Sequence, residues 1–465
     1  MIILHKFDAR HLSNLIYAYG LADCVIKFDD GSTLFDIFAQ AAIPNLHKFN
    51  GQGLSSMLWA YANVKVPNSQ LFEQAGDSIV AMKNLDKFWP QALSNIIWAY
   101  ATIDEQHPQL FENISNHIVG LNSLNEFWPQ ALSNTVWAYA TAEEKHPQLF
   151  EKVADHIITL DRLDKFKPQH LSNTLWSFAT AEESHPKLFK KMADHIVQLS
   201  NLSEFDEQHL SNIPWAFATA GESNPQLFNK LADEAIKRQH DFTAQGIANF
   251  LWAYASNGHV DGHILLSLVP SVKANRNEYT AQGLSNVAWA YSVANVNVPS
   301  VFNNEFINSC VNKDDEFILE HLRQLYQWQL WQEEIKSDVS LPESLQKKCY
   351  EAFTSQGFRP SKLQDDVISI VSSIGLQPQE EVLLKSGYRI DAVVEMDGKQ
   401  IAVEVDGPSH FIGRSGERTG STILKHRQVA ALDGIKVVSV PYWEWNKLKK
   451  DSRKKEQYLQ DLFGI

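Results

Sequence analysis

A motif of nine residues recurs along most of the chain and constrains its fold more than any other feature. LSNIIWAYA begins at Leu93 and LSNTVWAYA at Leu132. Related copies begin at Leu12, Leu54, Leu171, Leu210, Ile247 and Leu284. After a first interval of 42 residues, the copies start 39 or 37 residues apart. A regular period of this length is typical of a repeat array and not of several unrelated domains.

Each period contains two helical stretches separated by helix-breaking residues. In one copy Pro90 can open a first helix, residues 105–108 interrupt it, and QLFENISNHIVGL follows as a second helix. Two helices in 37–39 residues predict an α-solenoid unit. We expect about 8 to 9 such units over residues 1–336, the last a degenerate capping copy, LRQLYQWQL, from Leu322.

An aromatic column explains most of the 13 tryptophans of the chain. It contains Tyr17, Trp59, Trp98, Trp137, Trp176, Trp215, Trp252 and Trp289. One helix pair cannot close a core alone, so we interpret this column mainly as packing between repeats. Base stacking is the alternative interpretation.

A polar column precedes it on the same helices. Gln stands four residues before Asn in successive copies, so each pair shares one helix face. The pairs are Gln91 and Asn95, Gln130 and Asn134, Gln169 and Asn173, and Gln208 and Asn212. These amides could form a ladder between helices. They could equally offer donors and acceptors to single-stranded RNA, as modules that read one base per repeat do.

Charge and cysteine content limit the functional classes. The net charge is −14, and residues 1–336 hold 23 basic against 37 acidic residues, whereas residues 337–465 hold 18 of each. An acidic solenoid by itself favours a scaffold for protein partners. The three cysteines lie far apart, which excludes a disulfide framework and fits a reducing compartment. The apolar runs are too short for membrane insertion.

The repeat ends after residue 336, and a different pattern begins. We expect a helical connector over residues 337–360 and an α/β domain over residues 361–465. Strands are predicted at residues 381–384, 388–395 and 400–405, with Asp397 and Gly398 forming a hairpin turn. A helix over residues 422–432, a strand from residue 436 and a terminal helix over residues 454–463 complete it.

Three carboxylates in this domain are candidates for a metal site. Glu404 and Asp406 are two residues apart on one strand and share a face, and the hairpin brings Asp391 beside them. Mg²⁺ prefers such oxygen ligands, and it could activate water for phosphodiester cleavage. The candidate catalytic residues are Asp391, Glu404, Asp406, His410, Lys425 and Arg427. Alternatively, Asp406 belongs to a turn and the acids are solvated.

The stretches IAVEVDGPSHF, GSTILKHR and GIKVVSVPYWEW resemble the RAP domain, whose arrangement is similar to the PD-(D/E)XK endonuclease fold. The helical repeats resemble octotricopeptide or heptatricopeptide repeats. This resemblance implies an RNA-binding protein of mitochondria or chloroplasts that promotes maturation, stability or translation of transcripts such as mRNA or rRNA precursors. The endonuclease motif has an acid, one residue and Lys, where this chain has Glu-Val-Asp.

The PYWEW segment is a second candidate RNA contact. Tyr442, Trp443 and Trp445 could stack on bases beside the basic cluster that follows them. The alternative is that they are core aromatics at a strand end.

The first residues, MIILHKFDARHLSNLIYAYG, enter the first repeat at once and show no Arg-rich, acid-poor targeting peptide. A complete chain of this kind would be cytoplasmic. Three hypotheses follow: an RNA-binding factor whose C-terminal domain contacts or cleaves RNA, a metal-dependent RNA endonuclease, and an acidic solenoid scaffold.

Overall fold

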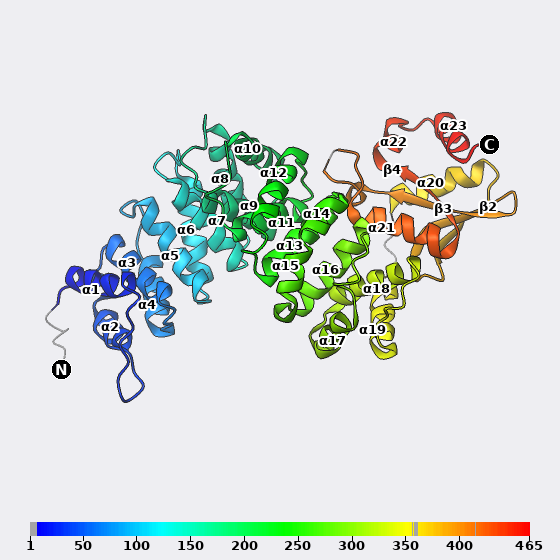
Figure 1. Cartoon of the computed structure of the whole chain (residues 1–465). Coiled ribbons are helices and arrows are strands. Elements are labelled where there is room, and N and C mark those ends of the chain that lie inside the picture. Colours follow the sequence, from blue (N-terminus) through cyan, green and yellow to red (C-terminus); the bar gives the residue numbers. More distant parts are fainter. Residues whose placement is uncertain (1–6, 356, 358–360, 414) are drawn as a thin grey trace. The chain divides into compact units, whose positions relative to one another are not determined.

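A computed structural model describes residues 7–355, 357, 361–413 and 415–465 (Figure 1). The chain forms two compact units, Met1–Phe205 and Asp206–Ile465. The first unit consists of five helix pairs, and the second contains four more pairs followed by a small α/β domain. The predicted architecture, an α-solenoid of helix pairs followed by a small domain with a sheet, is confirmed.

In the first unit, odd-numbered helices carry the repeated motif and even-numbered helices follow them. The first helices are α1 (Ala9–Leu21), α3 (Gly51–Asn63), α5 (Pro90–Thr102), α7 (Pro129–Thr141) and α9 (Pro168–Thr180). The second helices are α2 (Leu34–Ala42), extended by η2 (Ile43–Lys48), α4 (Ser69–Val80), α6 (Pro108–Gly120), α8 (Pro147–Thr159) and α10 (Pro186–Gln198). Most of them begin at a proline, as the helix-start signals predict.

The second unit continues the pattern and then leaves it. Its pairs are α11 (Glu207–Thr219) with α12 (Pro225–Lys237), α13 (Ala244–Ser256) with α14 (Gly262–Ser267) and α15 (Val269–Ala274), α16 (Ala281–Ala294) with α17 (Asn304–Asn312), and α18 (Leu319–Glu334) with α19 (Glu343–Thr354). Short η3 (Arg276–Glu278) and η4 (Asp314–Glu316) lie between pairs. α19 falls within the expected connector and packs along α18, so it serves as the second helix of a ninth pair.

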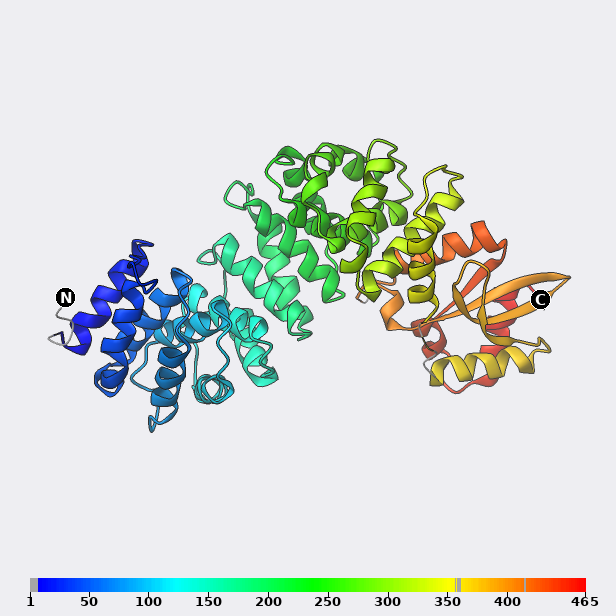
Figure 2. The same ribbon diagram turned by 90° about the horizontal axis from the view of Figure 1, so that it is seen from below.

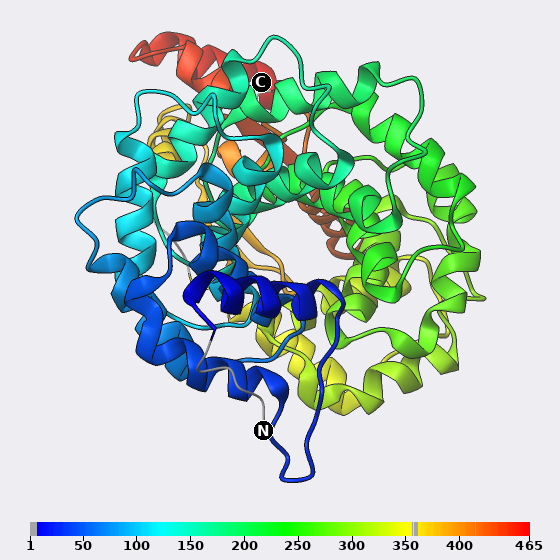
Figure 3. The same ribbon diagram turned by 90° about the vertical axis from the view of Figure 1, so that its left-hand side faces the viewer.

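Within each unit the helix pairs stand side by side along a curve (Figure 3). Each first helix packs closely against the first helices of its neighbours, whereas second helices approach one another less closely. The more tightly packed layer must lie on the inner side of a curve, so the first helices form the inner layer of each unit. Their polar and tryptophan columns are therefore on, or at the border of, the surface that solenoids commonly use for binding.

In five of the described first helices, a tyrosine near the helix end joins successive repeats. The hydroxyl of Tyr100 donates a hydrogen bond to the carbonyl of Phe72 (2.6 Å), and Tyr139 donates to Phe111 (2.7 Å). Tyr61, Tyr254 and Tyr291 make the equivalent contact. Burial raises the pKa of these hydroxyls well above the usual value, so they remain protonated donors.

The C-terminal domain is a four-stranded sheet flanked by helices. The strands are β1 (Gln379–Leu383), β2 (Arg389–Met396), β3 (Lys399–Asp406) and β4 (Lys436–Pro441). They lie in the order β1-β2-β3-β4, with the first three antiparallel and β4 parallel to β3. Asp397 and Gly398 both have positive φ (49° and 71°), which confirms the predicted hairpin turn.

The helices lie on both faces of this sheet. α20 (Lys362–Ser373), α22 (Tyr442–Lys447) and α23 (Ser452–Phe463) cover one face, where Val371, Val403 and Leu459 belong to the apolar core. α21 (Gly420–Gln428), preceded by η5 (Pro408–His410) and continued by η6 (Val429–Asp433), lies on the other side of the sheet from α20 (Figure 2). Among the helices that the structure describes, none has the length and apolar character needed to cross a bilayer.

The tyrosine contact can be tested by removing it from one repeat and by adding it to another. Tyr139→Phe removes the bond to Phe111 without opening a cavity, and we expect it to lower the free energy of unfolding by about 1 kcal/mol. In two repeats the same column holds Phe178 and Phe217. Phe178→Tyr should therefore add a contact and raise stability by up to a similar amount. Urea unfolding followed by tryptophan fluorescence measures both, and an unchanged midpoint for Tyr139→Phe would contradict the assignment.

Candidate functional site

One face of the sheet carries a row of polar side chains, and the other carries the apolar core. Glu404 and Asp406 alternate along β3 with the core residues Val403 and Val405. The register between β2 and β3 pairs Ala392 with Val403, and its continuation by one residue places Asp391 opposite Glu404. The three carboxylates therefore share one face, as the sequence predicts.

Each carboxylate in this row has a partner from the protein itself. Lys425 on α21 lies 2.7 Å from Glu404, measured from Nζ to Oε1. His410 Nδ1 lies 3.1 Å from Asp406 Oδ1, and the Ser439 hydroxyl also donates to Asp406. Asp391 accepts a hydrogen bond from the backbone N–H of Val405 (2.7 Å). These contacts stabilise charges that would otherwise be buried without compensation.

Burial and pairing shift the pKa values of this row in different directions. Burial raises the pKa of Glu404 to about 7, with Lys425 opposing the rise. Burial also raises the pKa of Asp391. For Asp406 the hydrogen bonds from His410 and Ser439 outweigh burial and hold the pKa below its usual value. The hydrogen bond to Asp406 in turn raises the pKa of His410.

The pairings bear on the predicted metal site. Among the described residues, no group of three or more His, Cys, Asp and Glu side chains is arranged to hold a metal ion. Glu404 and Asp406 instead direct oxygens at Lys425 and His410. The oxygen-rich donor set still suits Mg²⁺ in kind. A magnesium ion at Asp391, Glu404 and Asp406 stays a prediction.

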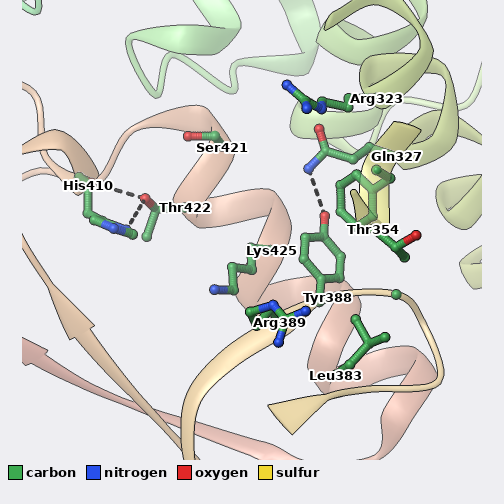
Figure 4. A pocket seen from close by; sticks show the side chains of 12 residues that line it. Arg323, Gln327, Thr354, Leu383, Tyr388, Arg389, His410, Ser421, Thr422 and Lys425 are labelled. Carbon is green, nitrogen blue, oxygen red and sulfur yellow. Dashed lines mark hydrogen bonds between the residues drawn. The ribbon is translucent and has the colours of Figure 1, made fainter. Parts of the chain in front are cut away.

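A cavity of about 310 Å³ lies beside this row, where the C-terminal domain meets the last helix pair (Figure 4). Three parts of the second unit contribute to its wall: helices α18 and α19, the segment around the start of β2, and α21 with the preceding η5. The lining residues are Arg323, Gln327, Phe353, Thr354, Leu383, Gly387, Tyr388, Arg389, His410, Ser421, Thr422 and Lys425. The cavity thus brings the predicted His410 and Lys425 together with residues that sequence reasoning did not select.

The wall of the cavity is basic. Besides His410 and Lys425 it contains Arg323 and Arg389, and none of its described lining residues is acidic. Arg323 donates through Nε to the carbonyl of Ala352 (3.0 Å), and Arg389 donates to the carbonyl of Glu381 (3.1 Å). These contacts orient each guanidinium without neutralising it. The two arginines therefore leave positive charge and spare donors available to an anion.

Hydrogen bonds fix the junction around the cavity. Gln327 on α18 donates to the hydroxyl of Tyr388 (2.8 Å), which in turn donates to Gln428 (2.8 Å). Gly420 begins α21 against α13, and a Cβ at this position would lie 2.0 Å from the carbonyl oxygen of Ala255. Only glycine allows this close approach. The cavity is therefore held between fixed elements of one compact unit.

Arg427, predicted as a catalytic residue, lies outside the cavity wall and contacts the helical repeats instead. Its Nε lies 2.8 Å from Glu334 of α18, and its other nitrogens donate to the carbonyls of Val293 and Ser292 near the end of α16. A cation at a helix C-terminus is favourable. Arg427 thus joins α21 of the C-terminal domain to α16 and α18. We call this set of contacts the Arg427 clamp.

The three aromatic residues predicted to stack on bases differ in their burial. Trp445 is 1% exposed, packs in the core and donates to Asp366 (2.7 Å), so it cannot stack on a base. For Trp445 the core alternative holds, because residues 442–447 form a short helix whose inner face is covered by α20 and α23. Tyr442 and Trp443 are half-buried, and Trp443 packs edge-on against Phe411. Only these two remain candidates.

On the solenoid, the amide columns are accessible. The four candidate glutamines are exposed and their asparagine partners are half-buried. Gln91 Nε2 donates to Asn95 Oδ1 (2.8 Å) within α5, so that bond joins residues of one helix and not of neighbouring helices. Most tryptophans of the motif column are half-buried and border this surface. The columns are thus placed to meet a ligand while they also contribute to packing.

Two exposed tryptophans stand next to these columns and were missed. Trp89 and Trp128 are 73% and 68% exposed, and each occupies the N-cap position of its first helix, α5 or α7. Other copies place a capping side chain there, such as Asn50, which accepts a hydrogen bond from the N–H of Gly53. The ammonium of Lys165 lies 5.3 Å from the ring centroid of Trp128. The signal that could have found them is a helix start without a capping residue.

The fold and the site define the chain as an α-solenoid protein with a C-terminal α/β domain and a basic cavity at their junction. Residues 6–301 match the family model described as RNA-editing substrate-binding complex 6 protein. Residues 403–462 match the RAP domain. The chain therefore belongs to the RNA-editing substrate-binding complex 6 protein family and carries a RAP domain.

A curated relative agrees with the second match. The chain is 36% identical over 105 residues to a protein of Oryza sativa subsp. japonica named "RAP domain-containing protein, chloroplastic". The aligned stretch covers 23% of this chain and 16% of the rice protein. Together these similarities give the chain an RNA-associated role.

The clamp at Arg427 generates a prediction about the junction. Arg427→Ala leaves Glu334, whose side chain is 10% exposed, without its partner. We expect the free energy of opening the contact between α21 and the helix pairs to fall by roughly 2 to 3 kcal/mol. Hydrogen–deuterium exchange would detect this change as faster exchange in α21 and at the end of α16. Arg453→Ala, at an exposed position of α23, is the matched control. Unchanged protection of α21 in Arg427→Ala would show that the clamp does not hold the domain.

Proposed function

We propose that the chain is an RNA-binding factor that acts in organellar-type RNA processing, stability or translation. The inner layer of the solenoid binds a single-stranded segment, and the cavity at the RAP domain contacts the same RNA. The matched family concerns substrate binding in RNA editing, and the rice relative is chloroplastic, which supports an organellar setting. Mitochondrion or chloroplast is thus the proposed compartment.

The observation that carries this proposal is the basic cavity in an acidic protein. The chain has a net charge of −14, yet the cavity wall combines Arg323, Arg389, Lys425 and His410 with no acidic lining residue among those described. Arginine and lysine side chains gathered in a depression favour phosphate oxygens. An acidic protein partner would meet the same charge, but the RNA-associated family makes RNA the better candidate.

The solenoid supplies the neutral part of the interface. Exposed glutamine amides with asparagine four residues later can pair with base edges, because each amide offers both a donor and an acceptor. This is the role proposed for the four pairs from Gln91 to Asn212. Trp89 and Trp128 add stacking platforms at the starts of two adjacent first helices. Tyr442 and Trp443 are proposed as further stacking contacts near the cavity.

The exposed tryptophans permit a test that separates binding from folding. Trp89→Asn with Trp128→Asn installs the capping residue found at Asn50, and should preserve or raise stability by about 1 kcal/mol per helix. The same change removes two stacking platforms, each worth about 1 to 3 kcal/mol per base. We therefore expect at least tenfold weaker binding of labelled single-stranded RNA in a filter assay, with an unchanged or higher unfolding midpoint.

Salt and sequence controls complete this test. Affinity of the unmodified protein should fall as salt rises, because phosphate contacts release counterions. Leu266→Ala, which removes another exposed apolar side chain, should leave RNA affinity unchanged. If the double Trp variant keeps full affinity, the stacking proposal is wrong. If the unmodified protein holds no RNA at any salt concentration, the acidic solenoid is better explained as a scaffold for protein partners.

A metal-dependent RNA endonuclease is the second candidate function. One observation favours it: Lys425 reaches Glu404 from α21, opposite Asp391, and so supplies in space the lysine that the Glu-Val-Asp stretch lacks. Each of the three carboxylates already has a partner within the protein, which argues against catalytic cleavage of RNA. Binding without cleavage is therefore the stronger proposal.

Incubation of labelled RNA with the protein and Mg²⁺ distinguishes the two functions. We expect retention of intact RNA with Mg²⁺ and with EDTA, because Glu404 and Asp406 remain engaged with Lys425 and His410. The opposite result is cutting that disappears with EDTA and in Glu404→Gln while RNA binding persists. That result would make the chain an endonuclease and would assign Mg²⁺ to the carboxylate row.

A further inference from the structure

We propose that the cavity at the junction holds the terminal phosphate of an RNA, so that the protein distinguishes a phosphorylated chain end from an internal stretch. The ligand class is a phosphomonoester on the first or last nucleotide. This inference rests on the proposed RNA binding and adds to it a specific feature of the RNA.

The size of the cavity suits one nucleotide and not a passing strand. Its volume of about 310 Å³ lies at the lower end of the range for small-molecule sites. Phe353 and Tyr388 form an apolar part of the wall, with their rings edge to face at 5.0 Å. A nucleotide has an apolar flat part and a charged part, and the wall offers a surface for each.

The charge of the wall matches a terminal phosphate better than a phosphodiester. A monoester carries about −1.5 to −2 charges and three acceptor oxygens at neutral pH, whereas a diester carries a single charge. Lys425 and His410 already face carboxylates, whereas Arg323 and Arg389 donate to backbone carbonyls and have no carboxylate partner among the described residues. The two guanidinium groups therefore provide charge and donors in excess of what the protein uses.

The Ser421 hydroxyl can add a donor on the remaining side, whereas the Thr422 hydroxyl already donates to the carbonyl of His410 (3.1 Å). Ser421 and Thr422 lie in the first turn of α21 and line the cavity between His410 and the array (Figure 4). The first turn of a helix carries partial positive charge and open N–H groups, which favour anions. In this cavity the turn stands together with two arginines that have no carboxylate partner among the described residues.

The composite construction makes the cavity selective for a ligand that enters it fully. Arg323 belongs to α18 in the last helix pair, Arg389 belongs to β2 of the sheet, and Lys425 belongs to α21. A phosphate that contacts all three must lie between these elements, and a cavity of about 310 Å³ then has room for a nucleotide on one side of it. An internal phosphate has a nucleotide on both sides and fits less well.

The experiment compares RNAs that differ only at their ends. Four forms of one sequence are used: linear with a 5′-phosphate, linear with a 3′-phosphate, linear with two hydroxyl ends, and circular. We expect at least one phosphorylated form to bind the full chain about tenfold more tightly than the hydroxyl and circular forms. Adenosine monophosphate, but not adenosine, should compete for this additional affinity, and inorganic phosphate should compete more weakly.

Variants of the arginines assign the preference to the cavity. Arg323→Ala with Arg389→Ala should abolish the difference between phosphorylated and hydroxyl ends, so that the phosphorylated forms bind no more tightly than the hydroxyl and circular forms. Arg453→Ala with Lys447→Ala removes the same charge from exposed positions and should keep the preference. Arg323→Lys with Arg389→Lys should retain part of it, because charge remains while the guanidinium geometry is lost. Circular dichroism and the unfolding midpoint confirm that each variant folds.

The failures of the two proposals give different results. Equal binding of all four RNAs, with equal losses in the double arginine variant, would overturn the terminal-phosphate inference and leave RNA binding intact. A preference for phosphorylated ends that survives in the double arginine variant would also overturn it, because another surface would then be responsible. Absence of binding to every RNA would remove the proposed function together with the inference.

Discussion

The packing of each first helix against its neighbours is the interaction on which the rest of the structure depends. A single helix pair cannot bury its own apolar face, so each repeat takes its stability from the next, with the tyrosine hydroxyls as links. The last pair has no repeat beyond it. The C-terminal domain covers it instead, through Tyr326, which donates to Ser386, and through Arg427. The domain is therefore also a cap.

This capping explains why the candidate site lies at the junction. α21 faces the polar side of the sheet and the array at once, so its side chains must satisfy both. Lys425 neutralises Glu404, and Arg427 neutralises Glu334. Arg323 and Arg389 remain beside the space between the elements with only carbonyl contacts. A fold that merely closed its end could bury apolar residues there, so these cations support the proposed phosphate ligand.

Features that depend on residues close together in the sequence could be predicted, whereas features that depend on tertiary packing could not. The repeat period, the Asp397–Gly398 turn and the shared face of Glu404 and Asp406 depend on spacings of a few residues, and all appear in the structure. The cavity depends on Arg323 and Arg389, which only tertiary packing brings together. Trp445 was misplaced because burial of a six-residue helix is decided by distant helices. Whether the carboxylates hold Mg²⁺ stays a prediction.

Part of the acidic charge of the solenoid lies away from the starts of the first helices, while Asp86 and Glu126 stand a few residues before Trp89 and Trp128. In the first unit, pairs of acidic residues occupy the turns that end the first helices, with Asp104, Glu143 and Glu182 at positive φ. Trp89 and Trp128 stand at the opposite ends of the same helices. An RNA along the helix starts would be one helix length, roughly 20 Å for 13 residues, from the acids in these turns. That distance exceeds the screening length of about 8 Å at physiological salt, so the turns would repel RNA only weakly there.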